Sequence, residues 1–240
     1  MPGLEHLPFA EVWLREPDEE VWRAASVAAR AIGKDGLEVW TTDETPEVVT
    51  FLEARGYEIV RRYVISELDV TAAPKPSAPA IPLTTFAARP DLAAELYSIA
   101  CEAYPDQPGR SEQRMSPFEV WRSWGLDPHP PDAYFIALED DRVLGYGYLE
   151  LDGEQWKNGF LGLARDARGR GLARAIKSAQ IAWAKEHDVP TLRTANELRL
   201  PQMLALNERF GYRPLYTELV LRGPTAPEVP PAGFEPALPA

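Results

Sequence analysis

Residues 161–187 read LGLARDARGRGLARAIKSAQIAWAKEH and join a strand-like apolar run, a basic turn with two glycines and a helix. The helix has apolar side chains at the spacing of one buried face, at Leu172, Ile176, Ala179 and Trp183. The first turn of a helix leaves backbone N–H groups unpaired, and glycines before it let a ligand approach the backbone closely. The segment Arg168-Gly169-Arg170-Gly171-Leu172-Ala173 therefore predicts a diphosphate-binding loop.

Basic side chains gather around this turn in an otherwise acidic chain. Within thirteen positions they are opposed only by Asp166, and they are Arg165, Arg168, Arg170, Arg174 and Lys177. Such a patch suits a ligand rich in phosphate groups. A solvated helix start with an ordinary glycine turn is the alternative.

Outward from this stretch, strand-like and helix-like patterns alternate over 83–222, which predicts an α/β (α+β) fold. Helices are expected at 89–104 and 116–124. Strand-like runs at 134–140, 142–152 and 156–164 then predict an antiparallel meander. After the 172–187 helix we expect a strand at 191–197, a helix at 201–210 that ends at Gly211, and a strand at 212–222.

Two stretches rich in Pro and Ala mark the domain limits, because fixed φ angles and missing N–H donors oppose regular structure. The first predicts a linker at 71–82, and the second predicts a tail at 223–240. They leave a domain at 83–222 and a shorter region at 1–70.

The region 1–70 reads as a reduced copy of the second half of the domain. An offset of 155 residues superposes four pairs of identical residues, Gly56 on Gly211, Pro46 on Pro201, Glu53 on Glu208 and Tyr57 on Tyr212. The order of expected elements also agrees, which favours an internal duplication. In this copy, residues 13–18 replace the glycine loop and carry two carboxylates, so we expect it to bind no diphosphate.

RGRGLARAIK after the strand NGFLGL, followed by TLRTANE and a helix ending in NERFGY, resembles the GNAT superfamily of N-acetyltransferases. With its half-size front repeat, the layout resembles tandem GNAT proteins in which one copy is degenerate. The resemblance implies a mixed, mostly antiparallel sheet flanked by helices, whose fourth and fifth strands splay apart around the pantetheine arm of acetyl-coenzyme A. It also implies direct transfer of the acetyl group to an amine.

The resemblance also assigns cofactor-binding residues. Backbone groups of Leu161, Gly162, Leu163 and Ala164 would meet the acetyl group and pantetheine, and Arg168 to Ala173 would hold the diphosphate. Asn196 would face the coenzyme arm. Asn207 stands where many members of the family carry the tyrosine that protonates the leaving thiolate, and Leu200 stands where an asparagine is usual.

The general base is not evident from the sequence. The family often places a glutamate on the fourth strand, yet WKNGFLGL contains no acid. Glu150, at the end of the preceding strand, and Glu154, in the turn, are the nearest candidates; each is alternatively a solvated carboxylate of the hairpin.

Composition excludes several classes of function. A net charge of −12 argues against nucleic acid as a partner, and three dispersed histidines with one cysteine offer no zinc-like spacing, so no metal is expected. Cys101 lies on an apolar helical pattern and is expected to be buried. No run approaches about 18 apolar residues, and MPGLEHLPFAEVW lacks the pattern of a signal peptide, so we expect no membrane span and a cytoplasmic protein.

The leading hypothesis is an acetyl-coenzyme A-dependent N-acetyltransferase for a primary amine of a small molecule. A protein amine or a different acyl group is the second hypothesis. A coenzyme A-binding regulatory module without turnover is the third. A homodimer remains open, and nothing in the loops around Trp121 and Trp124 names the amine.

Overall fold

The computed structural model describes residues 9–73, 81–107 and 114–227. These residues form two compact units. One spans Arg61–Leu219, and the other combines residues 9–60 with 220–227.

The larger unit is built on a mixed, mostly antiparallel sheet with the strand order β9-β3-β8-β7-β6-β5-β4. The strands are β3 Glu58–Asp69, β4 Leu83–Thr85, β5 Tyr134–Glu139, β6 Arg142–Asp152, β7 Gln155–Leu163, β8 Thr191–Glu197 and β9 Arg213–Pro224. The β4–β5, β5–β6, β6–β7 and β3–β8 pairs are antiparallel, whereas the β7–β8 pair is parallel. The expected meander is therefore present as β5, β6 and β7.

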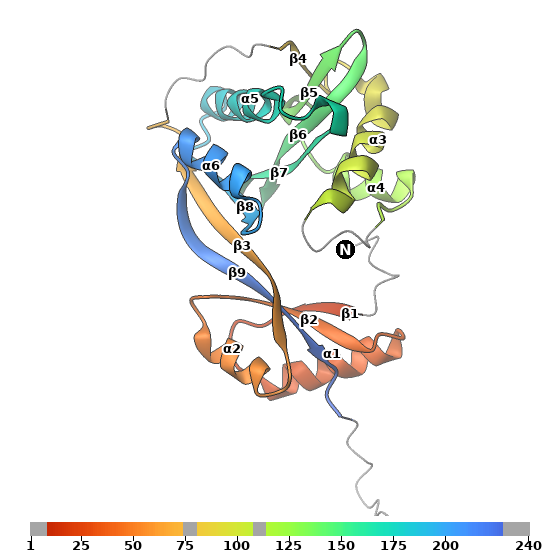
Figure 1. The fold of residues 1–240 in the computed structure, drawn as a ribbon, viewed down its shortest axis with the longest axis vertical. Helices are drawn as coiled ribbons and strands as arrows, with labels where there is room; N and C mark the ends of the chain where they lie inside the picture. Colours follow the sequence, from red (N-terminus) through yellow and green to blue (C-terminus); the bar gives the residue numbers. More distant parts are fainter. Residues whose placement is uncertain (1–8, 74–80, 108–113, 228–240) are drawn as a thin grey trace, which may run out of the picture. The chain divides into compact units, whose positions relative to one another are not determined.

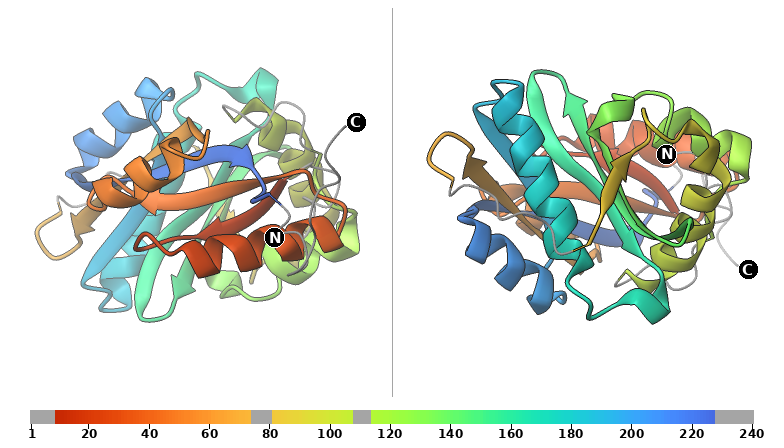
Figure 2. Two further views of the ribbon diagram at one scale, coloured as in Figure 1. Left: turned by 90° about the horizontal axis from the view of Figure 1, so that it is seen from below. Right: turned by 90° about the horizontal axis from the view of Figure 1, so that it is seen from above.

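Helices cover both faces of this sheet. They are α3 Ala93–Ala103, α4 Phe118–Gly125, α5 Leu172–Glu186 and α6 Pro201–Phe210, with the short 3-10 turns η1 Pro90–Leu92, η2 Tyr104–Asp106, η3 Pro131–Ala133 and η4 Arg165–Ala167. Figures 1 and 2 show α3 with α4 on one face of β5–β7 and α5 on the other. Leu96 and Trp121 pack with Tyr134 in one core, and Ile176 and Trp183 belong to the other.

Two local expectations need correction. The helix expected at 89–104 is divided into η1, α3 and η2, and α3 ends just before Pro105, which lacks the N–H that a continued helix requires. Cys101 is exposed rather than buried, since the apolar side of α3 runs through other residues, among them Leu96 and Ala100.

The two parallel strands β7 and β8 separate along their length. Within the described residues, Lys157 and Arg193 form their only recorded ladder pair. Both strands run away from this point toward their carboxyl ends, and the carboxyl end of β7 leads through η4 to α5. The splayed arrangement that the resemblance implied is therefore present.

The smaller unit has two helices on one face of a short sheet. Its elements are β1 Phe9–Trp13, α1 Glu19–Ala31, β2 Gly36–Thr42 and α2 Pro46–Glu53, together with the start of β3 and the end of β9. β1 pairs with β2 in parallel, and β9 follows β2 in the strand order. Figures 1 and 2 show α1 and α2 side by side, where Arg55 contacts Glu19 at 2.6 Å.

The compact units divide the chain at other places than the expected limits of 70, 82 and 222. β3 ends at Asp69 but pairs with β8 of the larger unit from Tyr63 onward. In the region expected to be a tail, Ala226 accepts a hydrogen bond from Arg30 at 2.6 Å and donates one to Ser26 at 2.9 Å. Residues 74–80 of the expected linker and 228–240 of the expected tail lie outside the described residues.

The offset of 155 residues also relates the secondary structure of the two regions. It superposes β2 on β8 and β3 on β9 with identical bounds, and it brings α1 onto α5 and α2 onto α6. The duplication itself stays a prediction. Across the described part of the chain, the helices are too short or too polar to cross a bilayer.

Candidate functional site

A cleft opens between β7 and β8 where the two strands diverge. Its volume is about 160 Å³. Its lining comes from β7, β8, α5 and α6 and includes Asn158, Leu161, Lys177, Asn196, Leu200 and Met203. A cleft between parallel strands can receive an extended polar chain, because the facing edges of the strands offer unpaired backbone groups.

The loop that begins α5 is shaped for an anion. Gly169 has φ +77° and Gly171 has φ +81°, a region that side chains with a Cβ rarely adopt. Gly171 is the N-cap, so no side chain caps the first turn, and no acidic residue lies in that turn. The N–H groups of this turn are therefore free to meet a ligand.

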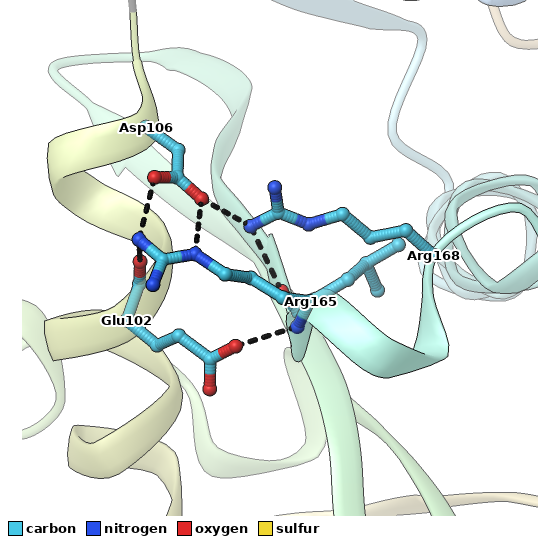
Figure 3. Close-up of polar contacts among 5 residues, drawn as sticks. Glu102, Asp106, Arg165 and Arg168 are labelled. Atoms are coloured by element: carbon cyan, nitrogen blue, oxygen red, sulfur yellow. Dashed lines mark hydrogen bonds and ion pairs between the residues drawn. The ribbon is translucent and has the colours of Figure 1, made fainter.

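The arginines around the loop are already engaged by carboxylates, which corrects the expectation of a free basic patch. Asp106, in the turn η2 that follows α3, accepts hydrogen bonds from Arg165 at 2.7 Å and 3.0 Å and from Arg168 at 2.7 Å (Figure 3). Hydrogen bonds from Arg165, and then those from Arg168, lower the pKa of the Asp106 carboxyl to about 2. Arg170 in turn pairs with Glu139, whose pKa its hydrogen bonds lower.

Glu102 strengthens the same junction, because its carboxylate accepts a hydrogen bond from the backbone N–H of Arg165 at 2.6 Å (Figure 3). The end of α3 is thus fastened to the loop before α5. Arg174 has no recorded ion pair among the described residues and is exposed on the first turn of α5.

Lys177 does not belong to the patch at all. It is 2% exposed and lies on the side of α5 that faces the cleft. Its ammonium donates a hydrogen bond to Asn158 Oδ1 at 3.2 Å and lies 4.4 Å from the centre of the Tyr212 ring. Burial lowers the pKa of Lys177 to about 7.

Asn158, in β7, links Lys177 to two other side chains through hydrogen bonds. Its Oδ1 also accepts a hydrogen bond from the Tyr212 hydroxyl at 2.6 Å, and its Nδ2 donates to Gln180 at 2.9 Å. Sequence reasoning missed Asn158 and Lys177 as a pair. The sequence carries two signals of the pair that were not used, a polar residue in the middle of a strand and a lysine next to the apolar face of a helix.

Asn196 and Asn207 come together as neighbours. Asn196 lines the cleft, and its side-chain oxygen accepts a hydrogen bond from Asn207 Nδ2. Asn207 is 3% exposed, and its Oδ1 has no hydrogen-bond partner in the structure. Leu200 also lines the cleft. An unpaired buried oxygen beside the cleft fits a ligand that brings a donor.

The backbone groups assigned to 161–164 are not equally available. Leu161 lines the cleft, and Leu161, Gly162 and Leu163 pair with residues of β6 on the other edge of β7. The N–H of Ala164 donates to Leu144 O at 2.9 Å, so Ala164 cannot give this N–H to a ligand. The correction follows from the register of the β6–β7 hairpin, which extends to this residue.

Glu150 is the better placed of the two candidate bases. It lies in β6 with its side chain 32% exposed, and its Oε2 is 3.9 Å from Nε2 of His129. Burial raises the pKa of the Glu150 carboxyl and lowers that of the His129 imidazole. Glu154 is exposed in the β6–β7 turn, and neither glutamate is among the residues that line the cleft.

The cleft between diverging parallel strands and the uncapped glycine loop define an acyl-coenzyme A-dependent acyltransferase. The chain belongs to the acetyltransferase (GNAT) family, whose model matches residues 93–212. Both the family prediction and the predicted fold class are therefore confirmed. Members of this family are N-acetyltransferases that use an acyl-coenzyme A and amine substrates.

Solved structures with the same fold include a GCN5-related N-acetyltransferase from Sphaerobacter thermophilus, at 19% identity and a TM-score of 0.65 over 85% of this chain and 65% of that one. A tandem GNAT protein from the clavulanic acid biosynthesis pathway is 18% identical, with a TM-score of 0.66 over 88% of this chain and 70% of that one. A GCN5-related N-acetyltransferase from Kribbella flavida is 18% identical, with a TM-score of 0.61 over 90% of this chain and 79% of that one.

These identities support a shared fold, and this chain spans 65% of the length of the Sphaerobacter protein. No curated protein shows significant similarity to the sequence. In the part of the chain that the structure covers, no group of three or more His, Cys, Asp or Glu side chains could hold a metal ion.

Proposed function

We propose that the protein moves an acetyl group from acetyl-coenzyme A directly to a primary amine of a small molecule. The observation that carries the proposal is the uncapped first turn of α5, with Gly169 and Gly171 at positive φ, beside the cleft between β7 and β8. Helix N–H groups suit the diphosphate, and the cleft suits the pantetheine arm. No metal is required for this reaction.

In this proposal, the segment Arg168 to Ala173 binds the diphosphate. Leu161, Gly162 and Leu163 face the acyl end of the coenzyme with those backbone groups that β6 leaves free, and Asn196 with Asn207 contacts its arm. The smaller unit offers a contrast that supports the assignment. There, Asp18 caps α1 by accepting a hydrogen bond from Val21 N–H at 2.9 Å, and Glu19 and Glu20 lie in the first turn. An anion would meet three carboxylates, so we propose that this unit is a degenerate copy without a coenzyme site.

Glu150 is the proposed general base. A primary amine has a pKa near 10.4, so its deprotonation at neutral pH costs roughly 4–5 kcal/mol. A carboxylate whose pKa is raised by burial accepts a proton more readily than an ordinary glutamate, and His129 lies beside it. The acceptor nitrogen then forms a C–N bond while the C–S bond of the thioester breaks.

The position of Glu150 supports a small acceptor. Glu150 is itself largely covered, so a slender amine reaches it more easily than a residue on a folded protein surface. A protein amine or a larger acyl group is the competing assignment.

A coenzyme-binding module without turnover is the second candidate. Asn207 in place of an acid favours it, because an amide cannot protonate a thiolate. Thiol release from acetyl-coenzyme A, measured across a panel of small amines and amine-bearing peptides, distinguishes the candidates. We expect release with small amines and a loss of about 10²-fold or more in Glu150→Gln. Tight coenzyme binding without release with any amine would refute the proposed reaction.

A further inference from the structure

Lys177 is a buried ammonium that the proposed reaction does not yet use. It is 2% exposed, and neither its hydrogen bond to Asn158 nor its contact with the Tyr212 ring supplies a negative charge. No carboxylate is recorded within ion-pairing distance of it among the described residues. Burying an unpaired ammonium is costly, and an apolar residue would fill this place in α5 without that penalty. The lysine therefore calls for a functional explanation.

The direction of the strands fixes which end of the cleft Lys177 faces. β7 and β8 meet at Lys157 and Arg193, and Asn158 is the next residue of β7. At the other end, β7 leads to the glycine loop that would bind the diphosphate. A coenzyme that enters with its diphosphate at the loop therefore brings its sulfur toward the closed end, where Asn158 holds Lys177.

The other groups around this end are poor proton donors. Asn158 and Gln180 are amides, and the Tyr212 hydroxyl is occupied because it donates to Asn158. Burial also raises the pKa of Tyr212, which disfavours proton transfer from it. The remaining titratable groups that line the cleft are Tyr63 of β3 and Glu197 of β8. These residues are opposite each other in the β3–β8 ladder, at the end where β7 and β8 diverge. Arg199 donates a hydrogen bond to the Glu197 carboxylate.

We propose that Lys177 is the catalytic residue that donates a proton to the sulfur of coenzyme A as the thioester breaks, a role that rests on the proposed function. One Nζ–H proton of Lys177 moves to the sulfur, which leaves as a thiol, and Lys177 becomes a neutral amine. The surplus proton of the attacking nitrogen goes to Glu150, and solvent returns a proton to Lys177.

The chemistry of Lys177 matches this step. A lysine pKa of about 7 lies near that of a thiol, which is about 8.5, so proton transfer between the two groups is nearly balanced at neutral pH. An ordinary surface lysine with a pKa near 10.4 would hold its proton more firmly. The carbonyl of Asn158 keeps the ammonium directed across the cleft.

The experiment compares the wild-type protein with Lys177→Met and Lys177→Gln, and uses Lys185→Met, which changes a lysine of the same helix outside the cleft, as the matched control. Calorimetric titrations with coenzyme A and with dethio-coenzyme A, in buffers of different ionisation enthalpy, measure binding and proton release separately from turnover. Both Lys177 variants should fold, because Met removes a buried charge and Gln keeps a donor for Asn158; thermal unfolding checks this.

We expect the wild type to release protons on binding coenzyme A but not dethio-coenzyme A, since the bound thiol donates a hydrogen bond to the neutral amine of Lys177 and favours this unprotonated form. The Lys177 variants should lose this release and bind coenzyme A about tenfold more weakly, with unchanged affinity for dethio-coenzyme A. Their kcat should fall by about 10²-fold and lose its decline at alkaline pH, whereas Lys185→Met keeps both properties.

Proton release and kcat that are the same in the wild type and both Lys177 variants would overturn the assignment, and so would an equal loss of both in Lys185→Met. Failure of the wild type to bind coenzyme A would instead refute the proposed function. Binding and turnover in the wild type with indifferent Lys177 variants would refute only the role of Lys177.

Discussion

Replacing Asp106 with Asn should tighten coenzyme binding while weakening the folded state. Asp106 holds Arg165 and Arg168 at 2.7 Å each, and in the proposed complex Arg168 must leave it to meet the diphosphate. A surface pair of this kind contributes roughly 0.2–1 kcal/mol. Removing the competing carboxylate should therefore improve the dissociation constant for coenzyme A by a factor of about 1.4 to 5.

The stability change can be worked from the same carboxyl group. Its pKa of about 2 in the folded protein compares with about 3.9 in an unfolded chain, which corresponds to an upper bound near 2.6 kcal/mol. The Asp106 side chain is 30% exposed, so solvent screening reduces this to about 1 kcal/mol. A depressed pKa adds stability above the unfolded value, and this stability is lost as the pH falls from about 4 toward 2.

Calorimetry with coenzyme A and acid unfolding of both proteins measure the two effects. Asp166→Asn is the matched control, because Asp166 lies in η4 and pairs with Arg142 at 2.8 Å instead of with the loop arginines. It removes the same charge near the loop without freeing Arg168. Equal gains in affinity for both variants, or weaker binding by Asp106→Asn, would refute the reasoning.

Three further predictions use other parts of the structure. Gly171→Ala should lower the free energy of unfolding by roughly 1 kcal/mol, because φ at this position is +81°, even though no atom lies within 4 Å of the new Cβ. The melting temperature should fall, and an unchanged melting temperature would contradict this. In the wild type, kcat/KM should fall on the acidic side at a pH above the ordinary glutamate range, because burial raises the pKa of Glu150. Glu150→Gln should abolish this fall, and a fall that persists would exclude Glu150 as the base. Asp18→Ala should cost roughly 1 kcal/mol of stability through the lost cap of α1 and leave coenzyme affinity unchanged by calorimetry; a changed affinity would argue that the smaller unit takes part in binding.

Much of the fold followed from local pattern. Local physical causes fix the glycine loop, the helix at 172–187 and the end of α6 at Gly211. The observed α5 and α6 begin and end within a residue or two of the expected bounds. The helix expected at 89–104 was less accurate because Pro105 removes the N–H donor that α3 would need to continue. The compact units differed from the expected domain limits because β3 and β9 each serve both units, and such pairing depends on contacts between distant residues.

The site was less predictable than the fold for a related reason. A sequence shows charges but not their partners, so Asp106, 59 residues before Arg165, was not recognised as the carboxylate that neutralises the patch. The sequence analysis groups Lys177 with the arginines of the basic turn, whereas in the structure Lys177 is one of the buried residues of α5. Backbone groups of Ala164 are assigned to the ligand by the resemblance, whereas its N–H bonds to Leu144, because the exact register of β6 with β7 cannot be read from the sequence.

The central claim is that the chain binds one acetyl-coenzyme A, at the loop from Arg168 to Ala173. Calorimetric titration of acetyl-coenzyme A into the wild type and into Gly171→Glu tests it most directly, with circular dichroism to confirm that the variant is folded. We predict one coenzyme per wild-type chain and no measurable binding by the variant, whose carboxylate would stand beside the diphosphate. Unchanged affinity in Gly171→Glu, or two coenzymes per wild-type chain, would contradict the account.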